Sequence, residues 1–137
     1  MNHVARRRPP YSDAEIPYLS RGRWRRVSAN GIEPNDSAPE NLHDPAPEQI
    51  AACRLWLRVF AIPTKTIRPA RDSYSYKHLA EDFAGEYVSN GAFIQAAILE
   101  GFRIERARSH GGVNAWLALR IRRRGETPGP ANDVGPT

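Results

Sequence analysis

Three cations recur every three residues near the middle of the chain, and their chemistry suits phosphate binding. Lys65, Arg68 and Arg71 stand in the stretch IPTKTIRPARD, whose two prolines favour an extended backbone. Such a row of positive charges could lie along the phosphates of a nucleic acid. A solvated loop would show the same pattern, so the sequence leaves both interpretations open.

Residue types that catalyse reactions are present, but they do not form catalytic patterns. The sequence contains no phosphate-binding loop, no dinucleotide-binding fingerprint and no HExxH pattern. Glu81 and Asp82 are neighbours on an expected helix, so their carboxylates diverge. The histidines are scattered, at His3, His43, His78 and His110. We therefore expect no enzyme activity, no cofactor and no metal site.

Charge is distributed in blocks along the 137 residues, which carry a net charge of +5. Residues 1–26 hold seven arginines and two acids, and residues 27–48 hold five acids and no lysine or arginine. Residues 49–124 hold 13 basic and six acidic residues. A basic arm and a basic domain together predict a polyanionic partner. Charge that serves only solubility remains the alternative.

The apolar residues define a single small domain. Residues 1–46 are rich in arginine, proline and acids and predict a disordered arm, basic over 1–26 and acidic over 27–48. Residues 124–137 predict a second disordered tail, which leaves residues 47–123 to form the domain. No run is long and apolar enough to span a membrane, and no secretory signal is recognisable. We expect a cytoplasmic location, which the single cysteine, Cys53, also fits.

Three helices are predicted within the domain. The first runs from Pro47 to Ala61, with Cys53 on its apolar stripe, and Pro63 ends it. The second covers Tyr76 to Ala84, with Ser75 as its N-cap and Gly85 as a left-handed C-cap. The third follows the cap Ser89, runs to about Glu100 and is apolar on nearly every side, so it must lie centrally. The residues expected to share one core are Trp56, Leu57, Phe83, Phe93, Ile98 and Leu117.

A β-hairpin is predicted to follow the third helix. Residues 102–107 and 113–122 alternate between two faces, and SHGG between them forms the turn. Residues 62–72 are expected to be an irregular connector. The fold class is therefore α+β, with three helices, a C-terminal β-hairpin and two disordered tails.

The residues KHLAEDFAGEYVSNGAFIQAAILEGFRIER resemble the helix-turn-helix and first wing strand of winged-helix proteins, and the resemblance covers residues 73–122. In that family the third helix enters the major groove of DNA and the wing reaches the backbone or minor groove. The resemblance implies that Asn90, Gly91 and Gln95 face the groove and that Lys77 and Ser89 lie near phosphates. It implies a wing tip of Arg106, Arg108, Ser109 and His110. With the connector cations and Arg122, these residues form the predicted nucleic-acid-binding surface.

Two functions therefore remain open. The first is binding of nucleic acid, with duplex DNA the expected form, through the third helix and the basic wing. The alternative is a protein–protein module, an adaptor or inhibitor, that docks on an acidic protein surface through the wing or through Tyr74, Tyr76, Tyr87 and Trp116. SNGAFIQAAILEGF also resembles small bacterial proteins of mobile elements, which implies no activity. Exposure of Asn90 and Gln95 would favour DNA, and burial of the whole third helix would favour a protein partner. The oligomeric state is not predicted.

Overall fold

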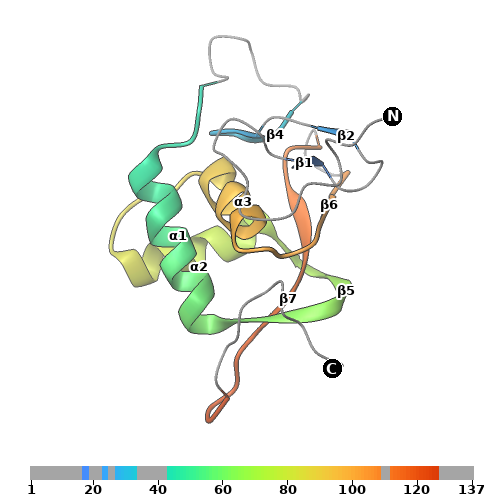
Figure 1. The fold of residues 1–137 in the computed structure, drawn as a ribbon. Helices are drawn as coiled ribbons and strands as arrows, with labels where there is room; N and C mark the ends of the chain where they lie inside the picture. Colours follow the sequence, from blue (N-terminus) through green and yellow to red (C-terminus); the bar gives the residue numbers. More distant parts are fainter. Residues whose placement is uncertain (1–16, 19–22, 25–26, 34–42, 109–111, 127–137) are drawn as a thin grey trace.

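The computed structural model describes residues 17–18, 23–24, 27–33, 43–108 and 112–126. These residues form an α+β fold in which three helices stand beside a small antiparallel sheet (Figure 1). The helices are α1 (Pro47–Phe60), α2 (Ser73–Ala84) and α3 (Asn90–Leu99). The sheet contains β5 (Ala61–Asp72), β6 (Ile104–Arg106) and β7 (Ala115–Ile121). Two-residue strands form two further ladders, β1 (Pro17–Tyr18) with β2 (Arg23–Trp24) and β3 (Val27–Ser28) with β4 (Gly31–Ile32).

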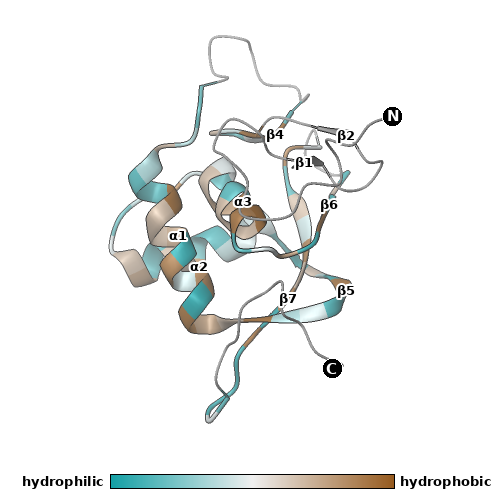
Figure 2. Ribbon diagram, in the orientation of Figure 1, coloured by the Kyte–Doolittle hydropathy of each residue, from teal (hydrophilic) through white to brown (hydrophobic). Residues whose placement is uncertain are grey.

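Helix α3 lies at the centre of the fold, as its sequence predicts. Ser89 caps it by accepting a hydrogen bond from the amide of Ala92 at 3.1 Å, which confirms the predicted start. All ten of its residues are buried. Figure 2 shows hydrophobic residues on α3 and on the neighbouring helix α1. Trp56 of α1 meets Phe93 edge-on, with ring centroids 5.9 Å apart.

Residues 61–72 form the long strand β5, so the prediction of an irregular connector is wrong. Pro63 pairs with Leu119 and Arg68 with Leu117, in antiparallel register with β7. The strand order β5-β7-β6 places β5 at an edge, where a proline without an amide hydrogen is tolerated. Register shifts on both sides of Arg68 interrupt the ladder. Local sequence did not show the usual alternation because the strand is bulged.

Helix α2 begins three residues earlier than predicted. Asp72, not Ser75, is its cap and accepts a hydrogen bond from the amide of Ser75 at 3.0 Å. The helix ends where predicted, at Gly85, whose φ of 74° is the left-handed conformation that glycine favours. Phe83 was expected to lie in the core, but it lies at the surface. Its side chain is 45% exposed and meets Phe60 edge-on at 5.2 Å.

The predicted C-terminal hairpin is one part of a three-stranded sheet. Ile104 pairs with Leu117 and Arg106 with Ala115, so β6 and β7 are antiparallel as expected. β7 also pairs with β5 along its other edge. Most of the predicted turn, residues 109–111 with Ser109 and His110, lies outside the described residues. The central strand β7, rather than an isolated hairpin, therefore organises the sheet.

Part of the predicted disordered arm packs on the core. Val27 and Ile32, on the paired strands β3 and β4, are buried in the same cluster as α3. The amide of Ile32 donates to the carbonyl of Val113 at 3.0 Å, and the amide of Gly91 donates to the carbonyl of Ala29 at 3.0 Å. Two apolar side chains in a polar segment are thus enough to anchor it. The arm before residue 17 and the tail after residue 126 lie outside the described residues.

Helix α3 and this segment touch so closely that the contact requires glycine. A Cβ atom at Gly91 would overlap the carbonyl oxygen of Ser28. Any larger residue at this position would therefore push β3 and β4 away from α3.

We predict that Ile32→Ala lowers the free energy of unfolding by about 2–5 kcal/mol, because it removes a fully buried side chain from the core. Chemical denaturation of the full chain measures this loss. Ile121→Ala, at an exposed position of β7, is the control and should change stability by under about 1 kcal/mol. Equal, small effects of both substitutions would show that β3 and β4 do not cover α3.

Candidate functional site

The exposed edge strand β5 carries a basic surface, formed by Lys65, Arg68 and Arg71. All three residues are exposed. Lys65 and Arg68 line a hollow of about 570 Å³ together with Arg120 of β7. The guanidinium of Arg71 lies 5.4 Å from the ring centroid of Tyr76, a cation–π contact, and has no carboxylate partner within ion-pair distance in the described part of the chain. We call these three residues the β5 basic surface.

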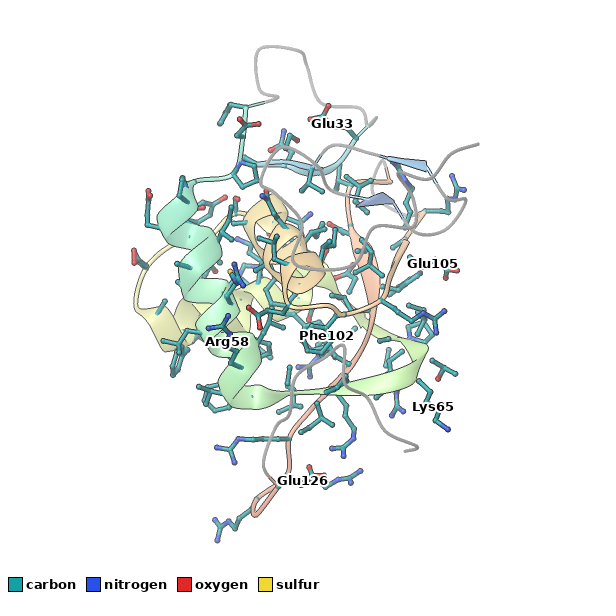
Figure 3. The ribbon with its side chains drawn as sticks, viewed as in Figure 1. Glu33, Arg58, Lys65, Phe102, Glu105 and Glu126 are labelled. Carbon is teal, nitrogen blue, oxygen red and sulfur yellow. The ribbon has the colours of Figure 1, made fainter. Side chains whose placement is uncertain are left out.

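The acidic groups of the domain neutralise cations elsewhere. Glu100 lies 2.6 Å from Arg54 and 2.8 Å from Arg58, so α1 is paired with the end of α3. Glu126 lies 2.6 Å from Arg120. Among the described residues, the side chains of Lys65 and Arg68 have no acidic partner within ion-pair distance. Lys65 and Arg68 therefore carry exposed positive charge on β5, and Lys65 lies at the opposite side of the view in Figure 3 from Arg58.

The amide side chains expected to read DNA are buried. Asn90 is 7% exposed and Gln95 is 2% exposed, so the prediction that they face a groove is wrong. Gly91 is covered by β3 and β4, and the hydroxyl of Ser89 is occupied by the cap. The N-terminal segment with β3 and β4 packs on the first turn of α3, which the resemblance to winged-helix proteins had implied would face DNA. The burial of Asn90 and Gln95 thus favours a protein partner over the recognition of bases by α3.

Asn90 is instead the centre of a buried hydrogen-bond network. Its Oδ1 accepts from the hydroxyl of Ser73 at 2.8 Å, and its Nδ2 donates to Oδ1 of Asn114 at 2.9 Å and to the carbonyl of Asn30 at 3.0 Å. Asn114 donates in turn to Asp72 at 3.2 Å. The Ser73 hydroxyl also accepts from the amide of Ala115. The network joins the end of β5 and the starts of α2 and α3 to the start of β7.

The predicted wing residues do not form one surface. Arg106 turns inward and donates to the carbonyl of Glu33 at 3.1 Å. Arg108 is exposed, and His110 lies outside the described residues. Arg122 is half-buried, with its guanidinium 5.6 Å from the ring centroid of Phe60. Of the predicted wing, only Arg108 is shown with an exposed charge.

Lys77 was expected to face outward, near phosphates, but it is buried between two tyrosines. Its Nζ lies 5.2 Å from the ring centroid of Tyr74 and 4.6 Å from that of Tyr87. Glu81 accepts from it at 3.0 Å and from Nδ1 of His78 at 2.9 Å. Burial would raise the pKa of Glu81, but the hydrogen bonds from Lys77, the Val88 amide and His78 outweigh it and lower that pKa.

The sequence predicted Tyr74 and Tyr87 as part of an aromatic docking surface, but it did not predict that Lys77 lies between them. Tyr74 and Lys77 are three residues apart on α2, a spacing that predicts a shared helix face. Tyr87, however, reaches the cluster from the loop before α3. Its position depends on the packing of that loop, which local periodicity does not encode.

Comparison of the chain with models of known protein families, with curated protein sequences and with solved structures found no match. No helix in the described part of the chain is long and apolar enough to cross a membrane. Among the same residues, no group of three or more histidine, cysteine or acidic side chains is placed to hold a metal ion. Cys53 is buried, as predicted, and burial raises the pKa of its thiol to about 12, which keeps it protonated.

We predict that Asn90→Ala destabilises the protein by roughly 1–3 kcal/mol or more, because it leaves buried polar partners unsatisfied. Urea denaturation of the variant and of Asp82→Ala, an exposed position outside the network, measures the difference. A loss no greater than that of the control would show that the network contributes nothing to stability.

A pH dependence follows from Glu100. Burial would raise the pKa of its carboxyl, but hydrogen bonds from Arg58 and Arg54 prevail and hold it below the ordinary value of 4.5. A lowered pKa contributes stability above pH 4.5 that is lost as the pH falls through the folded-state value. Glu100→Gln should therefore be less stable than the native protein at neutral pH, and this difference should shrink on acidification. Thermal melts between neutral and acidic pH test this, with Glu105→Gln as the exposed control.

Proposed function

We propose that this protein binds nucleic acid through the phosphate backbone, with the β5 basic surface as the main contact. The observation that carries the proposal is that Lys65 and Arg68 are exposed, lack an acidic partner among the described residues and line one hollow with Arg120. Phosphate contacts supply most of the affinity of proteins that bind nucleic acid without reading its sequence.

The geometry of β5 supports this use. Residues three apart on a regular strand point to opposite faces. The register shifts on both sides of Arg68 break that alternation, and Lys65 and Arg68 line the same hollow. The backbone of an edge strand is extended and accessible, so its cations can follow a linear polyanion.

The arrangement of α2, α3, β6 and β7 also supports the proposal, because winged-helix proteins bind DNA with this order of elements. The buried helix α3 departs from that family, since its amides do not face solvent. Contact along β5 instead of through α3 would give binding with little dependence on base sequence.

A second candidate is a protein–protein module. The complete burial of α3 favours it, as do the exposed tyrosine rings of Tyr74 and Tyr87. Aromatic side chains with an exposed face are common anchors of protein interfaces. Failure to bind any nucleic acid would promote this candidate.

We predict that the affinity for DNA falls steeply as the salt concentration rises. Replacing Lys65 and Arg68 together by alanine should flatten the slope of log affinity against log salt concentration by about one to two units, at ~0.9 per phosphate contact. Fluorescence anisotropy with labelled DNA across a salt series measures the slope. The variant should bind all sequences more weakly, because phosphate contacts carry no sequence information.

The matched control is Arg58→Ala, which removes an exposed arginine that is already paired with Glu100. It should leave both affinity and slope close to those of the native protein. Absence of binding to double- and single-stranded nucleic acid at low salt would rule out the proposed function. If Arg58→Ala, which removes one charge instead of two, flattens the slope about half as much, only net charge matters and β5 is not the contact surface.

A further inference from the structure

A second hollow, of about 280 Å³, opens beside the two tyrosines that flank Lys77. Segments far apart in the sequence form it: the turn between β3 and β4, the first turns of α2, the loop before α3, and the residues that precede β7. Its walls include two side chains with large exposed rings, Tyr74 at 50% and Tyr87 at 64%. The complete lining is Ala29, Asn30, Tyr74, Lys77, Tyr87, Asn90, Val113 and Asn114.

The two rings are held at fixed places around one ammonium group. Nζ of Lys77 lies within 5.2 Å of both ring centroids, and its own position is fixed by the ion pair with Glu81. Tyr74 is further held by His78, whose ring meets it edge-on at 4.7 Å. Exposed aromatic rings that are held in place lose little conformational freedom when a planar group stacks on them.

The polar groups at the floor of this hollow are already engaged. Asn90 bonds to Ser73, Asn30 and Asn114, and Asn114 also bonds to Asp72. The charge of Lys77 is offset by Glu81. The floor therefore has little capacity left to recognise the hydrogen-bonding edge of a ligand, and the exposed parts of the two rings, away from Lys77, are its main binding feature.

The hollow begins where the β5 basic surface ends. Asp72 is the last residue of β5, pairs with Trp116 of β7 and accepts from Asn114 of the hollow. Arg71 immediately precedes it, and Tyr74 follows two residues later. A polymer whose phosphates follow β5 toward Arg71 would thus have a base-sized, ring-lined space next to it.

We propose that this Tyr74–Tyr87 hollow takes an unpaired base of single-stranded nucleic acid, which stacks on the tyrosine rings while the phosphates contact β5. The inference rests on the proposed function and adds the strand state of the ligand. Proteins that bind single strands combine a positive surface along the backbone with aromatic rings on which bases stack. Stacking accepts every base, in keeping with the occupied amides of the floor. A paired base inside a duplex is stacked between its neighbours and cannot make this contact.

The test uses the full-length protein and two fluorescently labelled probes, a thymidine oligonucleotide of about 16 nucleotides, the upper range for one such site, and a duplex of the same length. Tyr74→Ala and Tyr87→Ala should each weaken single-strand binding roughly fivefold or more, since stacking on one aromatic ring contributes about that factor. Both variants should bind the duplex as tightly as the native protein.

Two controls separate the ring from other effects. Tyr74→Phe and Tyr87→Phe keep the ring and should retain single-strand affinity. Phe83→Ala removes a ring of similar exposure on α2 that does not line the hollow, and it should have no effect on either probe. Circular dichroism melts confirm that each variant is folded. Replacing thymidine by iodouracil and irradiating the native complex should crosslink a peptide that contains Tyr74 or Tyr87.

The outcomes also distinguish this inference from the proposed function. If the duplex binds through Lys65 and Arg68 but the tyrosine variants bind the single strand like the native protein, the hollow does not take a base and only this inference fails. Crosslinks confined to other peptides would overturn it equally. If neither probe binds at low salt, the proposed function fails and this inference fails with it.

Discussion

The complete burial of helix α3 is the constraint on which the rest of the structure depends. A helix that is apolar on nearly every side must be enclosed, and three different parts of the chain enclose it. Helix α1 covers it with Trp56, helix α2 packs on it, and the short ladder of β3 and β4 covers its start (Figure 1). The last contact is close enough to require Gly91. A helix in this position supports the fold instead of presenting side chains to DNA.

The burial of α3 also decides where function can lie. With the amides of Asn90 and Gln95 buried, the proposed recognition uses other described surfaces, the edge strand β5 and the tyrosines around Lys77. The ion pairs support this choice. Glu100 pairs with arginines of α1 and Glu126 pairs with Arg120 of β7, whereas Lys65 and Arg68 have no carboxylate partner among the described residues. The two surfaces meet at Asp72, which ends β5 and caps α2.

The network around Asn90 connects these features mechanically. It ties the start of α2 through Ser73, the start of β7 through Asn114, and the N-terminal segment through Asn30. Each bond is between residues that are distant in the sequence, and each satisfies a polar group near the protein interior. The floor of the tyrosine hollow is therefore part of the same structure that holds the sheet to α3, which keeps its walls in register with β5.

Local signals in the sequence determined the three helices, because the groups that start and end a helix lie within a few residues of each other. Ser89 and Gly85 are examples, and the apolar composition of α3 was enough to predict its burial. The strand β5 and the anchoring of Ile32 were decided only by tertiary structure, since pairing with β7 and packing on α3 involve residues more than forty positions apart. The orientation of Asn90 and the meeting of Tyr74 with Tyr87 depend on the same long-range contacts, so the candidate site emerged only when the chain was folded.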